Sequence, residues 1–313
     1  MIFNQGYSIA KRYAKNAAFA LHIDLGWASG VGGPLNSRIV AREQYWIMNS
    51  TAPPKVKALS RMVGDKSVMR RYAQTMGLNL SRSYYDVPSI ALIDFDSLPE
   101  NVVIKPNNSW SSNCVLIIKE TELLSGTKVP RSELRDFCQQ RFERLDVVPG
   151  VAPRILVEEF LQDHDQRFII PRDFKVFVAG GRAWIIQVLD RNGPPELHNH
   201  SFYTREWTRI NDRFQTSLKK GPTFPKPELL SELLKAAEFV ARDTGVFARL
   251  DFYLTTRGVV FGEFTAYPVG GIGFTQLGER YLCNLIDRFP DSIPDGWSAD
   301  RPRLPQVAKL DIA

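Results

Sequence analysis

The sequence predicts an α+β protein with mainly antiparallel sheets, on three observations. Segments of strand length and segments of helical periodicity are mixed along the 313 residues, without the regular strand–helix–strand alternation of a parallel sheet. Two pairs of strand-like segments are joined by short glycine-containing turns, at 180–181 and at 256–258, as in antiparallel hairpins. The chain is also long enough to bury a substantial core, in one large domain or in two to three smaller lobes.

The composition is that of an ordinary globular protein, with 44% hydrophobic and 24% charged residues. The formal net charge is +6, and the basic residues are spread along the chain rather than clustered. This mild excess suits a small anionic substrate, such as a nucleotide or an acidic sugar. We expect no nucleic-acid partner, because the sequence has no long Lys/Arg run and no recognised nucleic-acid module.

The sequence also indicates a cytoplasmic protein without an integral membrane segment. No stretch approaches the ~20 apolar residues that a membrane helix needs, and the apolar stretch near the N-terminus is broken by His22 and Asp24. Three cysteines lie far apart, without the spacing of metal ligands: Cys114, Cys138 and Cys283. We interpret them as inert thiols in a reducing compartment.

The first half of the chain is expected to begin with a helical segment over residues 1–60. Asp65 is a suitable N-cap for a helix over 66–76, which Gly77 ends. The other elements predicted in this half are helices over 9–21, 39–48 and 132–145, and strands over 89–95, 102–105, 115–119 and 155–160.

The second half is expected to contain two hairpins and two helices. The first hairpin joins strands over 174–178 and 183–189. Residues 190–227 contain several prolines and are predicted to be irregular, and we expect them to border an acceptor site. Helices are predicted over 228–243 and 277–288, the first ended by Gly245, and the chain after Phe289 is predicted to be extended.

The second hairpin, over 247–265, carries the most informative pair of residues. A three-residue loop at 256–258, with Gly258 in the left-handed region, places Asp251 opposite Glu263. Facing carboxylates repel one another unless a cation lies between them, and Mg²⁺ binds carboxylate oxygens together with phosphate oxygens. Thr265 points to the same face and is suited to add a hydroxyl ligand or to hold a water. The alternative is a chance pair of acids on a solvated strand face.

A second candidate site begins at Lys105, at the end of a predicted strand. The loop that follows is rich in small polar residues, among them Asn107, Ser109, Ser111 and Ser112. Backbone N–H groups and hydroxyls of such a loop can surround a phosphate, with Lys105 as a point charge beside it. The loop has no glycine and is therefore no Walker A motif; a plain hairpin loop is the alternative. Lys66 is suited to add a second cation, or it only begins a capped, solvated helix.

Two further strand ends carry charged residues. Glu158 and Glu159 end the strand over 155–160, where exposed backbone could pair with an adenine edge and a carboxylate could take its amino group or the ribose. Asp173 and Lys175 share one face of the next strand. They form either an ion pair or a site in which Lys175 faces a phosphate.

Taken in order, these segments resemble the ATP-grasp superfamily, and most closely its TupA-like branch, which is associated with teichuronopeptide-type surface polymers. The resemblance runs from about residue 65 to residue 285. The motifs that carry it are Asp65-Lys66 with Arg70, residues 103–107, 155–161 and 172–177, Asp190-Arg191, Lys226-Pro227, and residues 249–253 and 261–268 with Gly270-Gly271.

The resemblance implies an ATP-grasp fold, in which two α+β lobes with mainly antiparallel sheets clamp ATP. On this basis we expect four parts: a short N-terminal helical segment (1–60), a first lobe with the phosphate loop and hinge (61–160), a second lobe with the metal-binding hairpin (161–295), and a C-terminal tail (296–313).

The resemblance also implies roles for individual residues. Lys66 and Lys105 would contact the ATP phosphates, with the loop of Asn107, Ser109, Ser111 and Ser112 closing over them, and with Asp173 and Lys175 also facing the nucleotide. Glu158, Glu159, Phe160 and Leu161 would form the adenine-binding hinge. Asp251, Glu263 and Thr265 would hold one or two Mg²⁺ ions; many relatives have Asn where this chain has Thr265.

The catalytic candidates are Arg249, Lys105 and Lys175. Arg249 lies two residues before Asp251 on the same face and would steady the transferred phosphoryl group; a simple salt bridge to Asp251 is the alternative.

The chemistry implied is that of an ATP-dependent carboxylate–amine ligase. A substrate carboxylate attacks the γ-phosphate of ATP to give an acylphosphate and ADP, and an amine then displaces phosphate to form an amide or peptide bond, for example on a surface-glycan or small-metabolite precursor. The expected partners are ATP, an anionic carboxylate substrate and an amine. The alternatives are a kinase on the same scaffold, which gives a stable phosphorylated product, and a non-catalytic nucleotide-binding member of a polymer-assembly complex.

Overall fold

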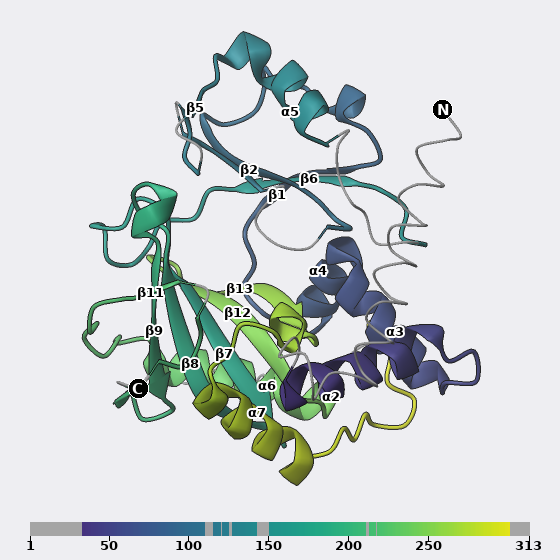
Figure 1. The fold of residues 1–313 in the computed structure, drawn as a ribbon. Coiled ribbons are helices and arrows are strands. Elements are labelled where there is room, and N and C mark those ends of the chain that lie inside the picture. Colours follow the sequence, from purple (N-terminus) through teal and green to yellow (C-terminus); the bar gives the residue numbers. More distant parts are fainter. Residues whose placement is uncertain are drawn as a thin grey trace.

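Two antiparallel sheets form the framework of the protein (Figure 1). The structure is a computed structural model, and it describes residues 33–109, 115–119, 121–124, 127–142, 150–210, 213–216 and 218–300. In Figure 1 the first sheet, with helix α5 (Leu134–Phe142) above it, lies over the second sheet. The predicted α+β class is confirmed, because the strand pairs among the described residues are all antiparallel except one short parallel pair at the edge of the second sheet.

The first sheet presents one apolar face to α5 and the other face to the second sheet. Its six strands have the order β1-β6-β2-β3-β4-β5. They are β1 (Ser83–Val87), β2 (Asn101–Pro106), β3 (Leu116–Lys119), β4 (Thr121–Glu122), β5 (Thr127–Lys128) and β6 (Ile155–Glu159). Val102 and Ile104 pack with Cys138 of α5, and burial alternates along β2. The strand period of two therefore directs Lys105 away from α5, toward the space between the sheets.

The second sheet is larger and has the order β10-β9-β8-β7-β12-β13, with β11 pairing with β9 in parallel. Its strands are β7 (Asp173–Ala179), β8 (Arg182–Asp190), β9 (Asn199–Thr204), β10 (Arg209–Ile210), β11 (Lys219–Lys220), β12 (Ala248–Thr255) and β13 (Gly258–Thr265). Helix α6 (Leu230–Thr244) packs on one face with Val176, Val240 and Leu250 in a shared core.

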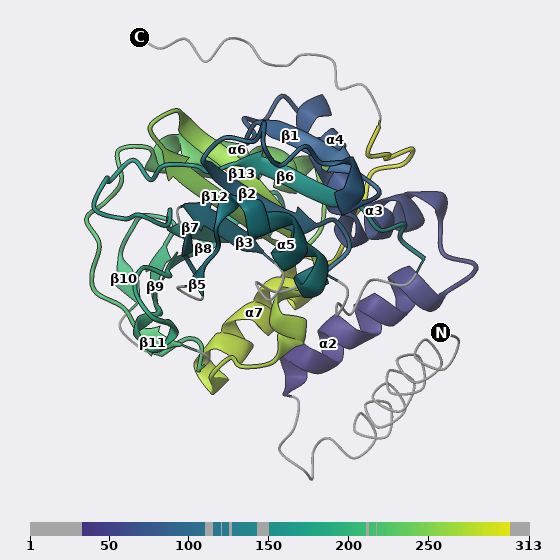
Figure 2. The ribbon, with the colours of Figure 1, turned by 90° about the horizontal axis from the view of Figure 1, so that it is seen from above.

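The opposite face of the second sheet is covered only in part. Helices α2 (Pro34–Glu43) and α7 (Gln276–Arg288), which lie beside each other in Figure 2, cover its apolar half. Phe177 packs there with Leu282 in a separate core. Asp173 and Lys175 share this strand face with Phe177 but belong to none of the apolar clusters. A polar half-face therefore remains, directed toward the first sheet.

Two N-terminal helices belong to the same core as the second sheet. They are α3 (Pro54–Gly64), which follows the five-residue π-helical turn Gln44–Met48, and α4 (Lys66–Thr75). Leu59 and Tyr72 pack in the cluster that contains Val176. The predicted division of the chain at residues 60, 160 and 295 stays a prediction.

Several predicted elements are confirmed closely. Asp65 caps α4, because its Oδ1 accepts hydrogen bonds from the backbone N–H groups of Ser67 (2.8 Å) and Val68 (3.4 Å). The hairpin at Gly180-Gly181 and helices α6 and α7 lie within about two residues of their predicted bounds, and Gly245 ends α6 with φ 65°. The helix predicted over 9–21 lies outside the described residues.

Two predictions of secondary structure are wrong. The strand predicted over 89–95 is instead a short 3₁₀ turn, Ile90–Leu92, begun by the hydroxyl of Ser89, and the edge strand is β1, just before Pro88. Residues 190–227 are not irregular throughout, because β9 pairs with β8 over six residues. The helix predicted over 132–145 begins as a 3₁₀ turn at Arg131–Glu133 and is described to Phe142.

Of the three cysteines, Cys138 and Cys283 are free and buried, and burial raises the pKa of the Cys138 thiol to about 12. Cys114 lies outside the described residues. None of the helices in the described part of the chain has the length and apolar character that a bilayer crossing requires.

Candidate nucleotide and metal site

The register predicted for the acidic hairpin is confirmed at Asp251, which pairs with Glu263 across β12 and β13. The predicted three-residue loop is wrong: Thr255 pairs with Gly258, so that the turn has two residues, and Gly258 has φ 91°. A bulge leaves Gly262 unpaired between Glu263 and Phe261, and this extra residue restores the register at Asp251. A side chain on Gly262 would crowd the carbonyl oxygen of Asp251, at 3.1 Å from an added Cβ.

Asp251 is buried and is compensated by two cations. Nε and Nη2 of Arg249 donate to its two oxygens at 2.7 and 2.9 Å, and Nζ of Lys175 also contacts it. Burial alone would lower the pKa of Arg249, but Asp251 holds that pKa above its usual value. Arg249 Nη2 also donates to Oγ1 of Thr265 (3.2 Å). The salt bridge between Arg249 and Asp251 is therefore present, and Thr265 lies next to it.

The polar half-face continues to Asp173 at the start of β7. Lys175 Nζ lies 3.4 Å from Asp173 Oδ2, and Arg191 Nη1 lies 2.6 Å from the same oxygen. Burial alone would raise the pKa of Asp173, but Arg191, Lys175 and a hydrogen bond from Tyr253 keep it below its usual value. The Asp173–Lys175 ion pair considered from the sequence is thus formed, while Lys175 also reaches Asp251.

Lys66 connects the predicted phosphate loop with the acidic hairpin. Its backbone N–H donates to Asn107 O (3.0 Å), its Nζ donates to Ser109 O, and Nζ lies 3.7 Å from Oε1 of Glu263. The pKa of Lys66 is lowered, first by burial and then by the nearby charge of Lys105, against the effect of Glu263. The two predicted phosphate-binding lysines are therefore close enough to influence one another.

Lys105 and Glu158 form a second buried ion cluster on the first sheet. Lys105 Nζ donates to Glu158 Oε2 (2.8 Å), which also accepts from Ser81 Oγ (3.0 Å), and Arg70 Nη1 lies 3.3 Å from Oε1. Burial by itself would raise the pKa of Glu158, but Lys105 and Arg70 lower it. Both oxygens of Glu158 are already bound, so a contact with ATP would require an exchange of partners.

The other residues predicted to bind the nucleotide differ in burial and in their hydrogen-bond partners. Asn107 is fully buried, and its amide bonds Asp65 Oδ1, Ala152 O and the N–H of Arg154, which gives it a structural role in holding the loop. Glu159 accepts from Arg257 Nη2 (2.8 Å) at the tip of the acidic hairpin, while Phe160 is half-buried and Leu161 is buried. Ser111 and Ser112 lie outside the described residues; Ser109 is buried.

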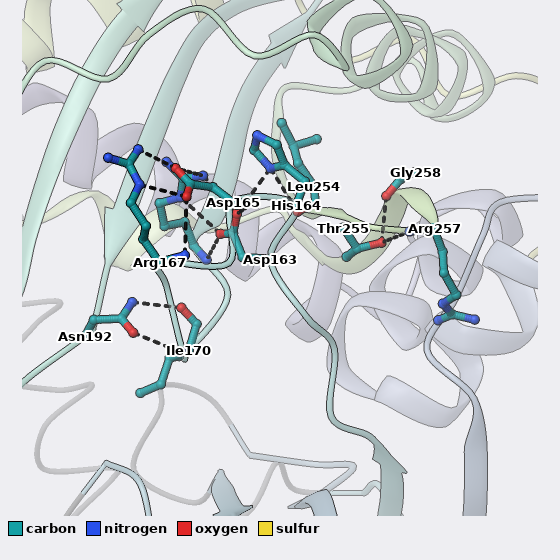
Figure 3. A network of polar contacts seen from close by, with 11 residues as sticks. Asp163, His164, Asp165, Arg167, Ile170, Asn192, Leu254, Thr255, Arg257 and Gly258 are labelled. Atoms are coloured by element: carbon teal, nitrogen blue, oxygen red, sulfur yellow. Dashed lines mark hydrogen bonds and ion pairs between the residues drawn. The ribbon is translucent and has the colours of Figure 1, made fainter.

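A buried pair that the sequence analysis missed fixes the chain directly after the predicted hinge. Arg172 donates from Nε (3.0 Å) and Nη2 (2.8 Å) to the two carboxylate oxygens of Asp163, and its backbone N–H donates as well (2.9 Å). Figure 3 shows Asp163 next to the hairpin residues Leu254 and Thr255; its backbone pairs with Thr255. The sequence signal for this pair is a short segment in which Asp163 and Asp165 are followed by Arg167 and Arg172.

Across both sheets, six basic side chains face four carboxylates. The basic members are Lys66, Arg70, Lys105, Lys175, Arg191 and Arg249, and the acidic members are Glu158, Asp173, Asp251 and Glu263. An excess of positive charge between two sheets favours an anionic ligand with several charges.

The family of the chain agrees with this arrangement. A family model described as "TupA-like ATPgrasp" matches residues 46–309, most of the sequence, and the chain belongs to this family of ATP-grasp proteins. None of the curated proteins matches the chain.

Several solved structures are similar to this chain at low sequence identity. D-alanine–D-alanine ligase from Bacillus anthracis, complexed with ATP, has 14% identity and a TM-score of 0.44 over 74% of this chain and 66% of that chain. A RimK domain protein ATP-grasp from Sphaerobacter thermophilus has 13% identity and a TM-score of 0.48, over 80% and 76%. D-alanine–D-alanine ligase from Helicobacter pylori has 16% identity and a TM-score of 0.45, over 75% and 62%. The assignment rests on the family match.

Replacing Arg172 by Met is expected to destabilise the protein by about 3 kcal/mol, because it leaves the carboxylate of Asp163 buried without its cation. Urea denaturation of wild type and variant measures this difference. Arg167→Met is the matched control: Arg167 pairs with Asp165 in the same segment, but its side chain is 75% exposed, so little or no change in the free energy of unfolding is expected. Equal changes for the two variants would contradict the importance of the buried pair.

The pH dependence of stability tests the Glu158 cluster. Since the pKa of Glu158 is lower in the folded state, it contributes stability above the unfolded value of about 4.3, and this stability is lost as the pH falls through the folded pKa. Glu158→Gln should therefore show a smaller loss of unfolding free energy than wild type between about pH 5 and pH 3. The control is Glu100→Gln, at an exposed position, whose unfolding free energy should show the same pH dependence as that of wild type. Parallel curves for Glu158→Gln and wild type would show that the cluster does not lower this pKa.

Proposed function

We propose that this protein is an ATP- and Mg²⁺-dependent carboxylate–amine ligase. The observation that carries the proposal is the pairing of Asp251 with Glu263, next to Arg249 and Lys175, on a sheet face opposite Lys66 and Lys105. This arrangement supplies oxygen ligands for a hard cation and basic groups for phosphates in one place. Membership of an ATP-grasp family supports ATP as the nucleotide.

The donor set of the hairpin fits Mg²⁺. Asp251, Glu263 and Thr265 offer only oxygen atoms, which Mg²⁺ prefers. No third carboxylate, histidine or cysteine joins the pair in the part of the chain that the structure describes, so we expect ATP phosphates and waters to complete the ligand shell. Bound there, Mg²⁺ would neutralise negative charge on the phosphates.

The basic residues have separate tasks in this proposal. Lys105 binds the phosphates from the first sheet, for which it leaves Glu158, and Lys66 binds them from the start of α4. Arg249 and Lys175, which neutralise Asp251 in the structure, turn toward the transferred phosphoryl group and the substrate carboxylate. Most of the rate enhancement then comes from positioning and charge stabilisation.

The reaction proceeds in two displacements. A carboxylate oxygen of the acid attacks the γ-phosphorus, and the bond between this phosphorus and the bridging oxygen breaks, giving an acylphosphate and ADP. The amine nitrogen then attacks the acyl carbon, the bond from carbon to the phosphate oxygen breaks, and inorganic phosphate and the amine proton leave. The product is an amide; the substrate class proposed is an amino acid or peptide joined to an acidic sugar or a small acid.

Phosphate release by the purified protein tests the proposal. ATP and Mg²⁺ are combined with a panel of acids (D-glucuronate, L-glutamate, acetate) and a panel of amines (the common amino acids and hydroxylamine). We expect release only when acid and amine are both present, with the amide or hydroxamate identified by mass spectrometry. Glu263→Gln should lower kcat by about 100-fold, whereas exposed Glu228→Gln, the matched control, should leave it unchanged.

Two results would contradict the ligase. A phosphorylated acid that persists in the presence of amines would favour the kinase. Nucleotide binding without turnover for any pair, together with equal behaviour of Glu263→Gln and wild type, would favour the non-catalytic nucleotide-binding protein.

A further inference from the structure

The row of polar residues on the second sheet extends one strand beyond the groups discussed above. Asp251 pairs with Glu263 on one side and with Lys175 on the other, and Lys175 pairs with Gln187 on β8. These four residues therefore lie side by side on adjacent strands. With strands about 4.8 Å apart, Gln187 lies roughly 5 Å from Lys175 and roughly 10 Å from Asp251 along the row.

Two buried partners hold the side-chain amide of Gln187. Its Nε2 donates to Oε1 of Gln215 at 3.0 Å and lies 3.2 Å from Nδ1 of His200. Gln215 and His200 are only 2% and 3% exposed. Both N–H groups of Gln187 are thus used inside the protein.

The protonation state of His200 fixes the orientation of this amide. Burial, followed by the nearby charges of Arg213 and Arg209, lowers the pKa of His200 to about 4, so that the ring is neutral near pH 7. The ring also meets the backbone of Gln215, a contact that favours a proton on the ring. With the single proton used there, Nδ1 is an acceptor, and only the amide nitrogen of Gln187 can donate to it.

This arrangement leaves the amide oxygen of Gln187 without a hydrogen-bond donor among the described residues. Within the described residues, no donor reaches Oε1 of Gln187, and this atom is not one of the unpartnered side-chain atoms that are sealed from solvent. Gln187 as a whole is 5% exposed, and an acceptor without a donor next to Lys175 is suited to recognise a ligand that binds over the row.

We propose that Oε1 of Gln187 accepts a hydrogen bond from the amine substrate and so determines where the nucleophile binds. This inference rests on the proposed ligase function. A lone amide oxygen attracts N–H donors and repels carboxylate and phosphate oxygens. Lys175 and Arg249, further along the row, attract those same oxygens. The row thereby separates the two substrates, with the acid and phosphate over the cations and the amine next to Gln187.

His200 and Gln215 are positioning residues in this scheme. They present the amide of Gln187 in one orientation without contacting the substrate themselves. Gln215 is held in turn, because the loop around it pairs with the segment after the acidic hairpin: Thr216 N donates to Gly273 O (2.8 Å) and Thr275 N donates to Phe214 O (3.0 Å). The proposed amine site is thus linked by backbone hydrogen bonds to the segment that follows β13.

Kinetics of Gln187→Met test the inference, since Met keeps the length of the side chain but removes the acceptor. Glycine, L-alanine and hydroxylamine are each titrated at saturating ATP and acid, with the acid of the panel that supports phosphate release. We expect the KM for the amine to rise about tenfold, which corresponds to the loss of one hydrogen bond to a charged group. The KM values for ATP and for the acid should change less than about twofold. Gln74→Met, on the exposed face of α4, is the matched control and should equal wild type.

A second variant keeps the test decisive if Gln187→Met does not fold. Gln215→Met removes one anchor but leaves Oε1, and it should raise the KM for the amine about threefold while leaving that for ATP unchanged. An unchanged KM for the amine in both variants, or a rise in the KM for the acid instead, would overturn the role of Gln187 while leaving the ligase intact. If wild type shows no amine-dependent phosphate release, the ligase proposal itself fails, and the inference fails with it.

Discussion

The charge of a buried carboxylate, Asp251, is the constraint on which the rest of the site depends. Asp251 is only 5% exposed, and such a group is tolerated in a protein interior only when cations and hydrogen bonds compensate it. Arg249 and Lys175 provide this compensation from the same sheet face. Their presence keeps half of that face polar, while α2 and α7 cover the apolar half. The same carboxylate and cations are the groups needed to hold a metal and a polyphosphate, so stability and the proposed function use one set of residues.

Contacts between the two sheets connect the loop after β2 and the end of β6 with this row. Lys66 begins α4, which packs in the core of the second sheet, and its side chain bonds the loop after β2 and faces Glu263. At the other end of the hairpin, Arg257 binds Glu159 at the end of β6. The buried pair of Asp163 and Arg172 then attaches the chain to the second sheet, where the backbone of Asp163 pairs with Thr255. Only residues 160–162 lie between Glu159 and Asp163.

The parts of the site that the sequence predicts are those set by local rules. The strand period of two aligns Asp251 with Arg249, and capping preference places Asp65 before α4. The acidic hairpin shows the limit of such rules. Its turn is one residue shorter than predicted, and the extra residue of the bulge at Gly262 compensates this difference. The predicted pairing of Asp251 with Glu263 is therefore correct although the predicted loop is wrong. Strand β1 was missed because Ser83–Val87 has little apolar alternation of its own and depends on pairing with β6. Gln187, His200 and Gln215 meet only through strand pairing and a distant loop, which no local pattern reveals.

Calorimetric titration with a non-hydrolysable ATP analogue, with and without Mg²⁺, shows whether the row around Asp251 binds a metal–nucleotide complex. Wild type should bind the analogue at least about tenfold more tightly with Mg²⁺ than without it, and Asp251→Asn should lose this difference, because the variant lacks one carboxylate ligand. Binding that is equally tight without Mg²⁺, and an Asp251→Asn variant that keeps the full effect of the metal, would each contradict metal–nucleotide binding by this row.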